Sequence, residues 1–538
     1  MGAIRVSHLG WRLPGGSELL RDVSFSVGDG ERAALVGANG VGKSTALSLI
    51  AGDLSPTSGT ISVDGRLGVM RQFVGTAAGP QTTRDLLVSI APVAVQRAHS
   101  ELVAAEATAT ADPLGYAHAV AAWSDVGGYH AEVHWDECAT RAVGLPFDEV
   151  ADRPLRTFSG GEQKRLALEV LLRGDADVLL LDEPDNFLDV DAKRWLEGEL
   201  RATRKTVLYI SHDRELLAAT ATKIVTIEAT GRSGERGSKA WTLGSGFAGY
   251  AEARHAHVDK LDKDRAIYDD ERKRLEQLVA EMRRRASFSE VFAPKLKAAE
   301  SRLRQFVERH EPPATVREQR IAMRLGGART GKRALVVEQL ELDGLTDPFD
   351  LDVDFGERVA VLGGNGAGKS HFLRLLAGEP VEHHGVFRLG AGVVPGLFHQ
   401  THEHPEWRTK SPLAILHDHD VVRGPAMSML RRYELDGCAE QPFETMSGGQ
   451  QARFQILLLE RSGATMLLLD EPTDNLDLVS AEALEAGLAS FTGTVIAVTH
   501  DRWFLRGFDR FVVFGADCTV TDHLSVPDAW ATSSPMGV

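Results

Sequence analysis

The chain carries the same succession of short motifs twice, in the same order, and this repeat constrains it to two similar domains. GANGVGKS at residues 37–44 returns as GGNGAGKS at residues 363–370, an offset of 326. Three later motifs return at an offset of 288: FSGGEQKR as MSGGQQAR, VLLLDEP as MLLLDEP, and SHDRELL as THDRWFL. Because 326 exceeds 288 by 38, the first copy holds about that many extra residues, which we place within residues 82–156. Ala and Leu at helical spacing there predict a helical subdomain with an added arm.

Each copy contains Gly-x4-Gly-Lys-Ser between a buried strand pattern and a helix pattern, the context of a phosphate-binding loop. Glycine lets the backbone N–H groups wrap a phosphate at a helix N-terminus. We expect the lysine to reach the β- and γ-phosphates and the serine to ligate Mg²⁺. The candidate ATP-binding residues are Gly37, Asn39, Gly40, Gly42, Lys43, Ser44 and Thr45 in the first copy, and Gly363, Asn365, Gly366, Gly368, Lys369, Ser370 and His371 in the second.

The Asp-Glu pair that ends the apolar run of each VLLLDEP-type motif predicts the chemistry of ATP hydrolysis. Asp182 and Asp470 are candidate Mg²⁺ ligands at the end of a buried strand. The following Glu183 and Glu471 are positioned to polarise the attacking water. The sequence therefore predicts an ATPase of the α/β class that uses ATP and Mg²⁺ and releases ADP and phosphate.

A basic helical linker is predicted between the two copies, within residues 251–333. This segment holds 21 Lys and Arg against 14 Asp and Glu, so its charge is +7, whereas the whole chain carries −16. Leu261, Tyr268, Leu275 and Met282 recur every seven residues, and a second apolar pattern follows Pro294. We expect a long helical hairpin with its tip near residues 286–293, between cassettes at 1–250 and 334–538.

Composition excludes several classes of protein. The chain has three cysteines, and they are far apart in the sequence. This number and spacing exclude a disulfide framework, a cysteine zinc site and an iron–sulfur cluster. Nowhere do about 18 apolar residues follow one another, so no integral membrane segment is expected, and the N-terminal residues lack a secretory signal pattern. We therefore expect a cytoplasmic protein with free thiols.

The order of the motifs resembles that of the ATP-binding cassette superfamily, with the two cassettes covering about 450 of the 538 residues. The resemblance implies that Ser159-Gly160-Gly161 and Ser447-Gly448-Gly449 are signature loops, each closing over ATP held by the other cassette. It further implies roles for residues outside the phosphate loops. Gln72 and Gln400 would contact the metal and the attacking water, and Asp189 and Asp477 would contact the opposite cassette. His212 and His500 would contact the γ-phosphate, and Trp11 would stack on the adenine.

Within that superfamily, the paired cassettes, the HDR-x-[FL]-L segment, the arm and the basic hairpin are similar to the F subfamily. Members of it bind ribosomes, place the hairpin in the exit-tRNA site, and tune translation or dislodge antibiotics. The resemblance implies a ribosome partner, with 23S rRNA and P-site tRNA near the hairpin tip, and a monomer whose cassettes pair within one chain. The candidate RNA contacts are Arg283, Arg284, Arg285, Phe288, Phe292, Lys295 and Lys297.

The sequence departs from the family pattern in both cassettes. The usual Asp-Glu-Pro-Thr-Asn-His-Leu-Asp stands as DEPDNFLD after residue 181 and as DEPTDNLD after residue 469, and His371 follows Ser370 where Thr is usual. Because both glutamates are present, we expect both sites to be active, with the second as the candidate for the slower one. Two other functions stay open: the ATP-binding subunit of a membrane transporter with a separate permease, and a clamp on DNA or a repair scaffold.

Overall fold

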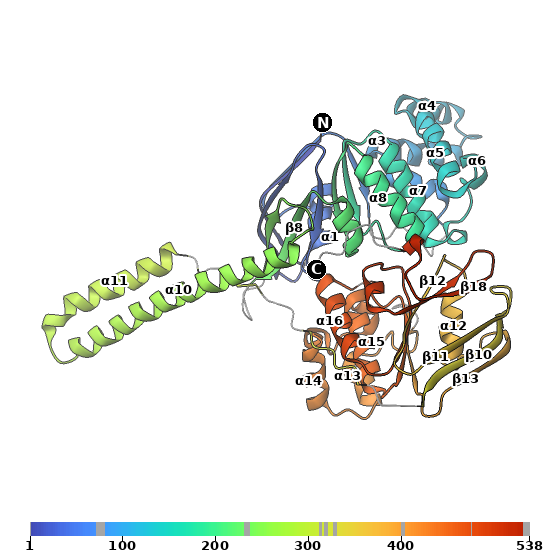
Figure 1. Ribbon diagram of the computed structural model, residues 1–538. Helices are drawn as coiled ribbons and strands as arrows, with labels where there is room; N and C mark the ends of the chain where they lie inside the picture. Colours follow the sequence, from blue (N-terminus) through green and yellow to red (C-terminus); the bar gives the residue numbers. More distant parts are fainter. Residues whose placement is uncertain are drawn as a thin grey trace.

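The computed structural model describes residues 2–71, 81–230, 237–310, 312, 315–316, 321–326, 331–399, 404–474 and 476–530. The chain forms two cassettes that face each other, and a helical hairpin projects from the junction between them (Figure 1). The prediction of two α/β cassettes joined by a long helical hairpin is confirmed. The proposed domain limits at 250/251 and 333/334 lie beside the starts of the hairpin, at Tyr250, and of the second cassette's first strand, at Arg333.

The sheet of the first cassette has a parallel core and an antiparallel lobe. Its strands are β1 (Ala3–Arg12), β2 (Glu18–Val27), β3 (Arg32–Val36), β4 (Ser58–Asp64), β5 (Leu67–Met70), β6 (Val178–Asp182), β7 (Thr206–Ile210), β8 (Lys223–Thr230) and β9 (Gly237–Leu243). They lie in the order β4-β1-β2-β9-β8-β3-β7-β6-β5. β6 and β7 are buried along their whole length, and their continuous apolar runs are typical of parallel strands covered on both faces.

Helices cover this sheet and build the arm. They are α1 (Lys43–Ala51), α2 (Thr83–Ile90), α3 (Val93–Glu106), α4 (Pro113–Asp125), α5 (Gly128–Val143), α6 (Phe147–Val150), α7 (Gly160–Arg173), α8 (Val190–Ala202) and α9 (Arg214–Thr220). Trp123 on α4 is 1% exposed and anchors the arm. A Cβ on Gly128 would lie 2.1 Å from the Trp123 ring, so only glycine lets α5 begin there.

The second cassette repeats the plan without the arm. Its strands are β10 (Arg333–Leu342), β11 (Phe349–Asp354), β12 (Arg358–Gly363), β13 (His383–Leu389), β14 (Pro395–Phe398), β15 (Met466–Asp470), β16 (Thr494–Val498), β17 (Arg510–Phe514) and β18 (Val520–His523), and its helices are α12 (Lys369–Leu376), α13 (Pro412–Asp418), α14 (Arg423–Arg432), α15 (Gly448–Arg461) and α16 (Leu478–Ser490). The core order β14-β15-β16-β12-β17-β18 matches β5-β6-β7-β3-β8-β9 strand for strand. The phosphate loops therefore leave equivalent central strands, β3 and β12.

The hairpin consists of α10 (Tyr250–Ala286) and α11 (Ala293–Arg309), joined by a turn at the far end from the cassettes (Figure 1). At 1.5 Å per residue the 37-residue α10 is about 55 Å long. Tyr268 and Leu275, two members of the predicted heptad, are buried, and Tyr268 stacks on Phe306 of α11 with ring centroids 5.1 Å apart. Apolar packing between the two helices thus holds the tip away from the body.

Candidate active sites

Both phosphate loops use backbone geometry that only glycine supplies at the first position. Gly37 has a φ of 151°, and Gly363 has a φ of 148°. A Cβ would lie 2.2 Å from the Ile227 carbonyl at Gly37 and 2.4 Å from the Phe514 carbonyl at Gly363. Each loop therefore lies directly against the neighbouring strand and is held there.

The two loop lysines are buried and aimed at their own loops. Lys43 Nζ donates to the carbonyls of Gly37 and Ala38 at 2.8 and 3.1 Å. Lys369 Nζ donates to the carbonyls of Gly363 and Gly364 at 2.9 and 2.7 Å. Burial lowers the pKa of both lysines, and nearby carboxylates oppose this shift. A nucleotide bound to the loop would bring its phosphates within reach of these ammonium groups. The lysines would then contact the phosphates in place of the loop carbonyls.

The carboxylates at the ends of β6 and β15 suit a hard cation. Asp182 is 5% exposed and Asp470 is 6% exposed. Burial, then the charge of Glu183, raises the pKa of Asp182 to about 6, while a hydrogen bond from Ser44 opposes the shift. Within the described residues the Oδ1 atom of Asp182 is buried and accepts no hydrogen bond. A buried carboxylate beside a hydroxyl is the oxygen donor set that fits Mg²⁺, so these residues could hold it and screen the phosphate charge.

The two glutamates share a strained backbone but differ in their side-chain contacts. Glu183 and Glu471 have φ values of 50° and 47°, uncommon for residues other than glycine. Glu183 Oε2 accepts from Asn186 Nδ2 at 2.7 Å. Glu471 Oε2 instead accepts from the backbone N–H of His500 at 3.0 Å. Burial, then the charge of Asp474, raises the pKa of Glu471 to about 8.

His500 is buried and His212 is half-buried, and the surroundings of both histidines disfavour the charged imidazolium. Burial, then the charge of Lys43, lowers the pKa of His212 to about 3. Burial, then Lys369, holds the pKa of His500 well below its usual range. His500 Nε2 lies 3.5 Å from Glu471 Oε1. A neutral imidazole can donate a hydrogen bond to a γ-phosphate oxygen without a charge of its own.

Each phosphate loop faces the opposite cassette. A cavity of about 370 Å³ combines the second loop with the signature loop of the first cassette; it is lined by Ser159, Gly160, Gly161, Asp185, Phe187, Leu188, Lys193, Asn365, Gly366, Ala367, Gly368, Lys369, Ser370, His371, Asp470, Glu471, Asp474, Val498 and His500. Asn365 Nδ2 also donates to the Phe187 carbonyl at 3.3 Å. In this arrangement, both cassettes are needed to complete the second site.

The first site has the reciprocal arrangement. A larger cavity, about 1530 Å³, is shared by loop residues 37–41 and by Gln450, Arg453 and Asp477 of the second cassette. The backbone N–H of Asn39 donates to Asp477 Oδ2 at 2.8 Å. Ser447 caps α15, as Ser159 caps α7, in a reciprocal capping box that points the helix N-terminus across the interface.

Some predicted site residues lie elsewhere. Trp11, on β1, is half-buried against the apolar cluster beneath the sheet and is not among the residues that line the first cavity, whereas Leu13 is. Its contact with adenine stays a prediction. Gln72 and Gln400 lie outside the described residues.

The sequence reasoning missed the polar side chains at the cassette interface. Lys193 on α8 is buried and pairs with Asp213 at 3.0 Å, and Asp185 and Asp474 line the same cavity as Lys193. The departures from the family pattern at residues 185 and 474 were the available signal. These two substitutions place a carboxylate next to the ATP sites, and the positive charge of Lys193 partly compensates the negative charge of Asp185 and Asp474.

Two phosphate loops, each facing a signature helix of the opposite cassette, define a twin P-loop nucleotide-binding protein. The family profile described as "ABC transporter" matches residues 20–186 and 346–474. The chain belongs to the ATP-binding cassette superfamily and, within it, to the F subfamily. Among the described residues, no helix has both the length and the apolar character needed to cross a membrane.

Similar proteins extend over nearly the whole chain. An "Antibiotic resistance protein" of Mycobacteroides abscessus is 49% identical over 98% of this chain and 100% of its own length. "ABC transporter F family member 5" of Arabidopsis thaliana is 29% identical, covering 94% of this chain and 74% of its own. A crystal structure of an archaeal ribosome recycling factor, aABCE1, in complex with the ribosomal stalk protein aP1 matches 94% of this chain and 87% of its own, with a TM-score of 0.56 and 17% identity. This last likeness concerns the fold.

Proposed function

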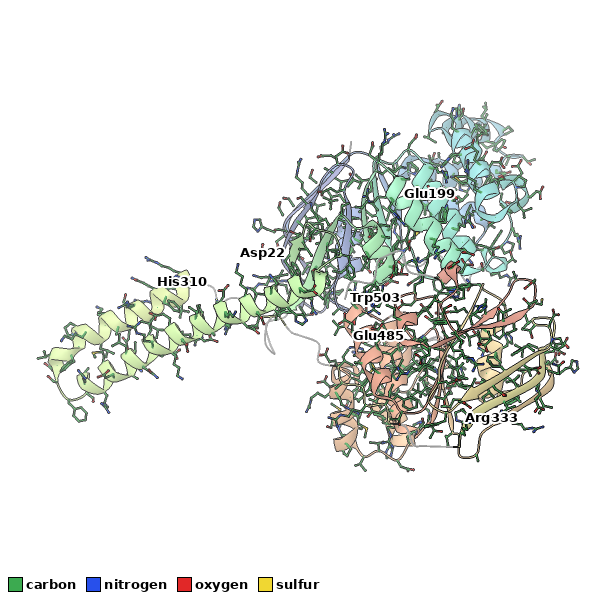
Figure 2. All side chains as sticks on the ribbon, in the orientation of Figure 1. Asp22, Glu199, His310, Arg333, Glu485 and Trp503 are labelled. Carbon is green, nitrogen blue, oxygen red and sulfur yellow. The ribbon has the colours of Figure 1, made fainter. Side chains whose placement is uncertain are left out.

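We propose that this protein is a cytoplasmic, monomeric Mg²⁺-dependent ATPase whose cassettes close on ATP. In that closed state it binds the ribosome and modulates translation or protects against ribosome-targeting antibiotics. The observation that carries the ribosome proposal is the hairpin: a long element that projects away from both cassettes and exposes apolar and basic side chains at its tip (Figure 2). Phe288 is 84% exposed and Val291 is 75% exposed there.

The charge along the hairpin supports contact with RNA at the tip and along α11. From the sequence, residues 251–282 hold 7 basic and 9 acidic side chains, a net of −2. Residues 283–309 hold 8 basic and 3 acidic side chains, a net of +5. Basic charge concentrated on one end of an element, in a chain of −16, is the pattern of a local phosphate-binding surface. Exposed aromatic rings such as Phe288 add surfaces on which bases stack.

The closure of the cassettes would depend on ATP because each ATP site is formed by residues of both cassettes. Each bound ATP would meet N–H donors of its own loop and of the opposite signature helix, so ATP would favour the closed pair. Hydrolysis by water, with Glu183 or Glu471 as the base, would remove the γ-phosphate and its share of these contacts. The resistance protein of M. abscessus supports the antibiotic part of the proposal by its printed name.

Ribosome co-sedimentation of the Glu183→Gln/Glu471→Gln protein tests this function. The two amides keep the shape of the side chains but remove the bases, so ATP should stay bound and the cassettes should stay closed. We expect this protein to pellet with 70S ribosomes in ATP and to remain in the supernatant in ADP.

A matched control separates nucleotide effects from the hairpin's charge. The same variant with the added loop substitution Lys369→Ala loses a phosphate contact but keeps the hairpin, and it should pellet less in ATP. Failure of the parent variant to pellet in either nucleotide would refute the proposed function. It would favour the ATP-binding subunit of a transporter with a separate permease.

A further inference from the structure

The two cassettes exchange a repeated pair of charged residues across their interface. Arg214 and Arg502 occupy the third position of the two His-Asp-Arg segments, and their numbers differ by 288. Glu197 on α8 and Glu485 on α16 differ by the same 288. Arg502 of the second cassette pairs with Glu197 of the first, and Arg214 of the first pairs with Glu485 of the second. The pairs are therefore crossed and related by the pseudo-twofold symmetry of the repeat.

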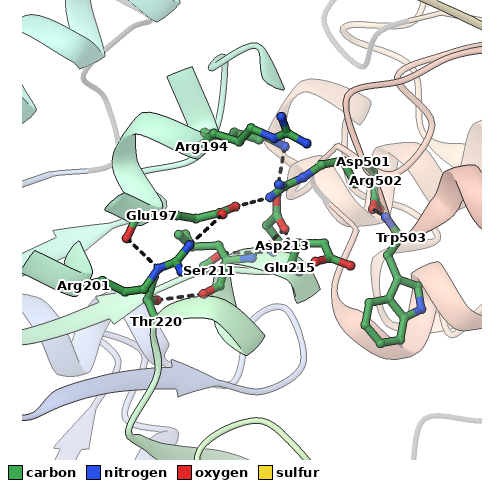
Figure 3. A network of polar contacts seen from close by, with 12 residues as sticks. Arg194, Glu197, Arg201, Ser211, Asp213, Glu215, Thr220, Asp501, Arg502 and Trp503 are labelled. Atoms are coloured by element: carbon green, nitrogen blue, oxygen red, sulfur yellow. Dashed lines mark hydrogen bonds and ion pairs between the residues drawn. The ribbon is translucent and has the colours of Figure 1, made fainter. Parts of the chain in front are cut away.

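Both arginines are almost completely removed from solvent. The Arg502 side chain is 1% exposed and that of its partner Glu197 is 2% exposed, and Arg502 Nη2 donates to Glu197 Oε1 (Figure 3). The Arg214 side chain is 6% exposed and donates to both carboxylate oxygens of Glu485, with Nη1 at 3.2 Å from Oε2. Each pair joins one cassette to the other, so both ion pairs exist only while the cassettes touch, and separation would return the four charged groups to water.

A tryptophan joins the two arginine segments. Trp503 follows Arg502, and its ring lies under the guanidinium groups of Arg506, at 3.8 Å, and of Arg214, at 5.2 Å. Arg506 pairs with Glu215 of the first cassette at 3.1 Å. Trp503 therefore contacts cations from both cassettes at once.

Each arginine is connected to a histidine of the active site by a short rigid turn. Asp213, between His212 and Arg214, accepts from the backbone N–H groups of Glu215 and Leu216 at 2.9 and 3.0 Å. In the second cassette Asp501 accepts in the same way from two N–H groups, at 2.9 and 3.1 Å. Each aspartate therefore caps the turn that carries the arginine, and this turn begins directly after the histidine.

We propose that Arg214 and Arg502 are positioning residues for ATP hydrolysis, which place His212 and His500 at the γ-phosphate only when each arginine meets the glutamate of the opposite cassette. The inference rests on the proposed closure on ATP. When the cassettes separate, each arginine loses its partner and its turn relaxes, and the histidine withdraws from the phosphate. Hydrolysis is thereby restricted to the closed pair.

Steady-state ATP hydrolysis by Arg502→Ala and Glu197→Gln tests this assignment, each in the Glu183→Gln background so that only the second site turns over, with intact folding checked by thermal melting. We expect kcat to fall at least about tenfold while KM for ATP changes less than about threefold, because the nucleotide contacts remain. The reversed pair Glu197→Arg/Arg502→Glu should restore at least about a third of kcat, since the charges still meet. Arg201→Ala is the matched control: Arg201 lies 3.6 Å from the same Glu197 carboxylate, but within its own helix.

Closure is measured separately, by small-angle X-ray scattering of the Glu183→Gln/Glu471→Gln protein with and without ATP and in the absence of ribosomes. ATP-dependent compaction together with a lowered kcat that the reversed pair restores supports the inference. Compaction combined with an unchanged kcat when Arg502→Ala is added to the Glu183→Gln protein, or an equal loss with Arg201→Ala, overturns the inference and leaves the proposed function intact. The absence of compaction in ATP overturns the closure on which both depend.

Discussion

Neutralising two cations at the hairpin tip should weaken ribosome binding by an amount that depends on salt. Arg283 and Arg285 pair with glutamates of the hairpin, whereas Arg284 and Lys297 are exposed and form no ion pair with the described residues. They are therefore available for phosphate. Loss of two phosphate contacts makes the negative slope of log K against log salt shallower by about 1.4 to 1.8. The same relation makes the Kd of Arg284→Gln/Lys297→Gln about 25 to 60 times larger at 0.1 M monovalent salt, but only about 5 to 9 times larger at 0.3 M.

The assay is co-sedimentation of the ATP-trapped protein with 70S ribosomes over a series of salt concentrations at fixed Mg²⁺. The matched control is Lys263→Gln/Lys273→Gln. It removes two exposed charges from the part of α10 that lies between the cassettes and the tip. We expect the control to keep the parent slope. An equal change of slope in both variants would mean that the hairpin acts through its total charge, and the assignment of the tip as the contact would be wrong.

Four further predictions concern the ATP sites. With the first site inactivated by Glu183→Gln, hydrolysis at the second should rise about fivefold between pH 7 and 8, because Glu471 acts as a base only when ionised and its pKa is raised to about 8. Asp474→Asn removes a like charge and should move this rise to lower pH in a rate–pH profile; an unchanged midpoint would contradict the role of that charge. Gly363→Ala should reduce nucleotide binding at the second site more than about tenfold, measured with a fluorescent ATP analogue, while Gly364→Ala, whose Cβ meets no atom within 4 Å, should bind normally. Removal of Mg²⁺ with EDTA should abolish phosphate release, and unchanged turnover would exclude the carboxylate–hydroxyl donor set as a metal site.

The sequence predicted the parts of the fold that depend on local pattern. The motif repeat predicted two cassettes with the same strand order, because the phosphate loop, the Asp-Glu pair and the His-Asp-Arg segment each stand at the end of a buried strand, and right-handed crossovers fix the neighbours of these strands. The seven-residue spacing around Tyr268 and Leu275 gave the hairpin, since an uninterrupted amphipathic helix needs a second helix to cover its apolar face. The arm was expected from the extra residues of the first copy, but not the contact between Trp123 and Gly128 that anchors it.

The rest depends on distances between residues far apart in the chain. Glu197 and Arg502 are 305 residues apart, and each alone is an ordinary charged residue of a helix or a turn. Their shared offset of 288 with Glu485 and Arg214 could have raised the hypothesis of a crossed pair, but only the packing of the cassettes shows that they meet. The contact of Glu183 with Asn186 is local, whereas the contact of Glu471 with the backbone N–H of His500 joins residues 29 apart and depends on the fold.

The most direct test of the central claim, that the ATP-closed protein places its hairpin tip in the ribosome, is tethered hydroxyl-radical cleavage. An iron chelate on Ser289→Cys at the tip, in the Glu183→Gln/Glu471→Gln protein with Cys518→Ser, would report the neighbouring RNA, and Leu524→Cys, 85% exposed on the second cassette, provides the control position. We predict ATP-dependent cleavage of 23S rRNA next to the P-site tRNA from the tip and a different pattern from the control. Cleavage that is absent, or that is the same in ADP and in ATP, would contradict the account.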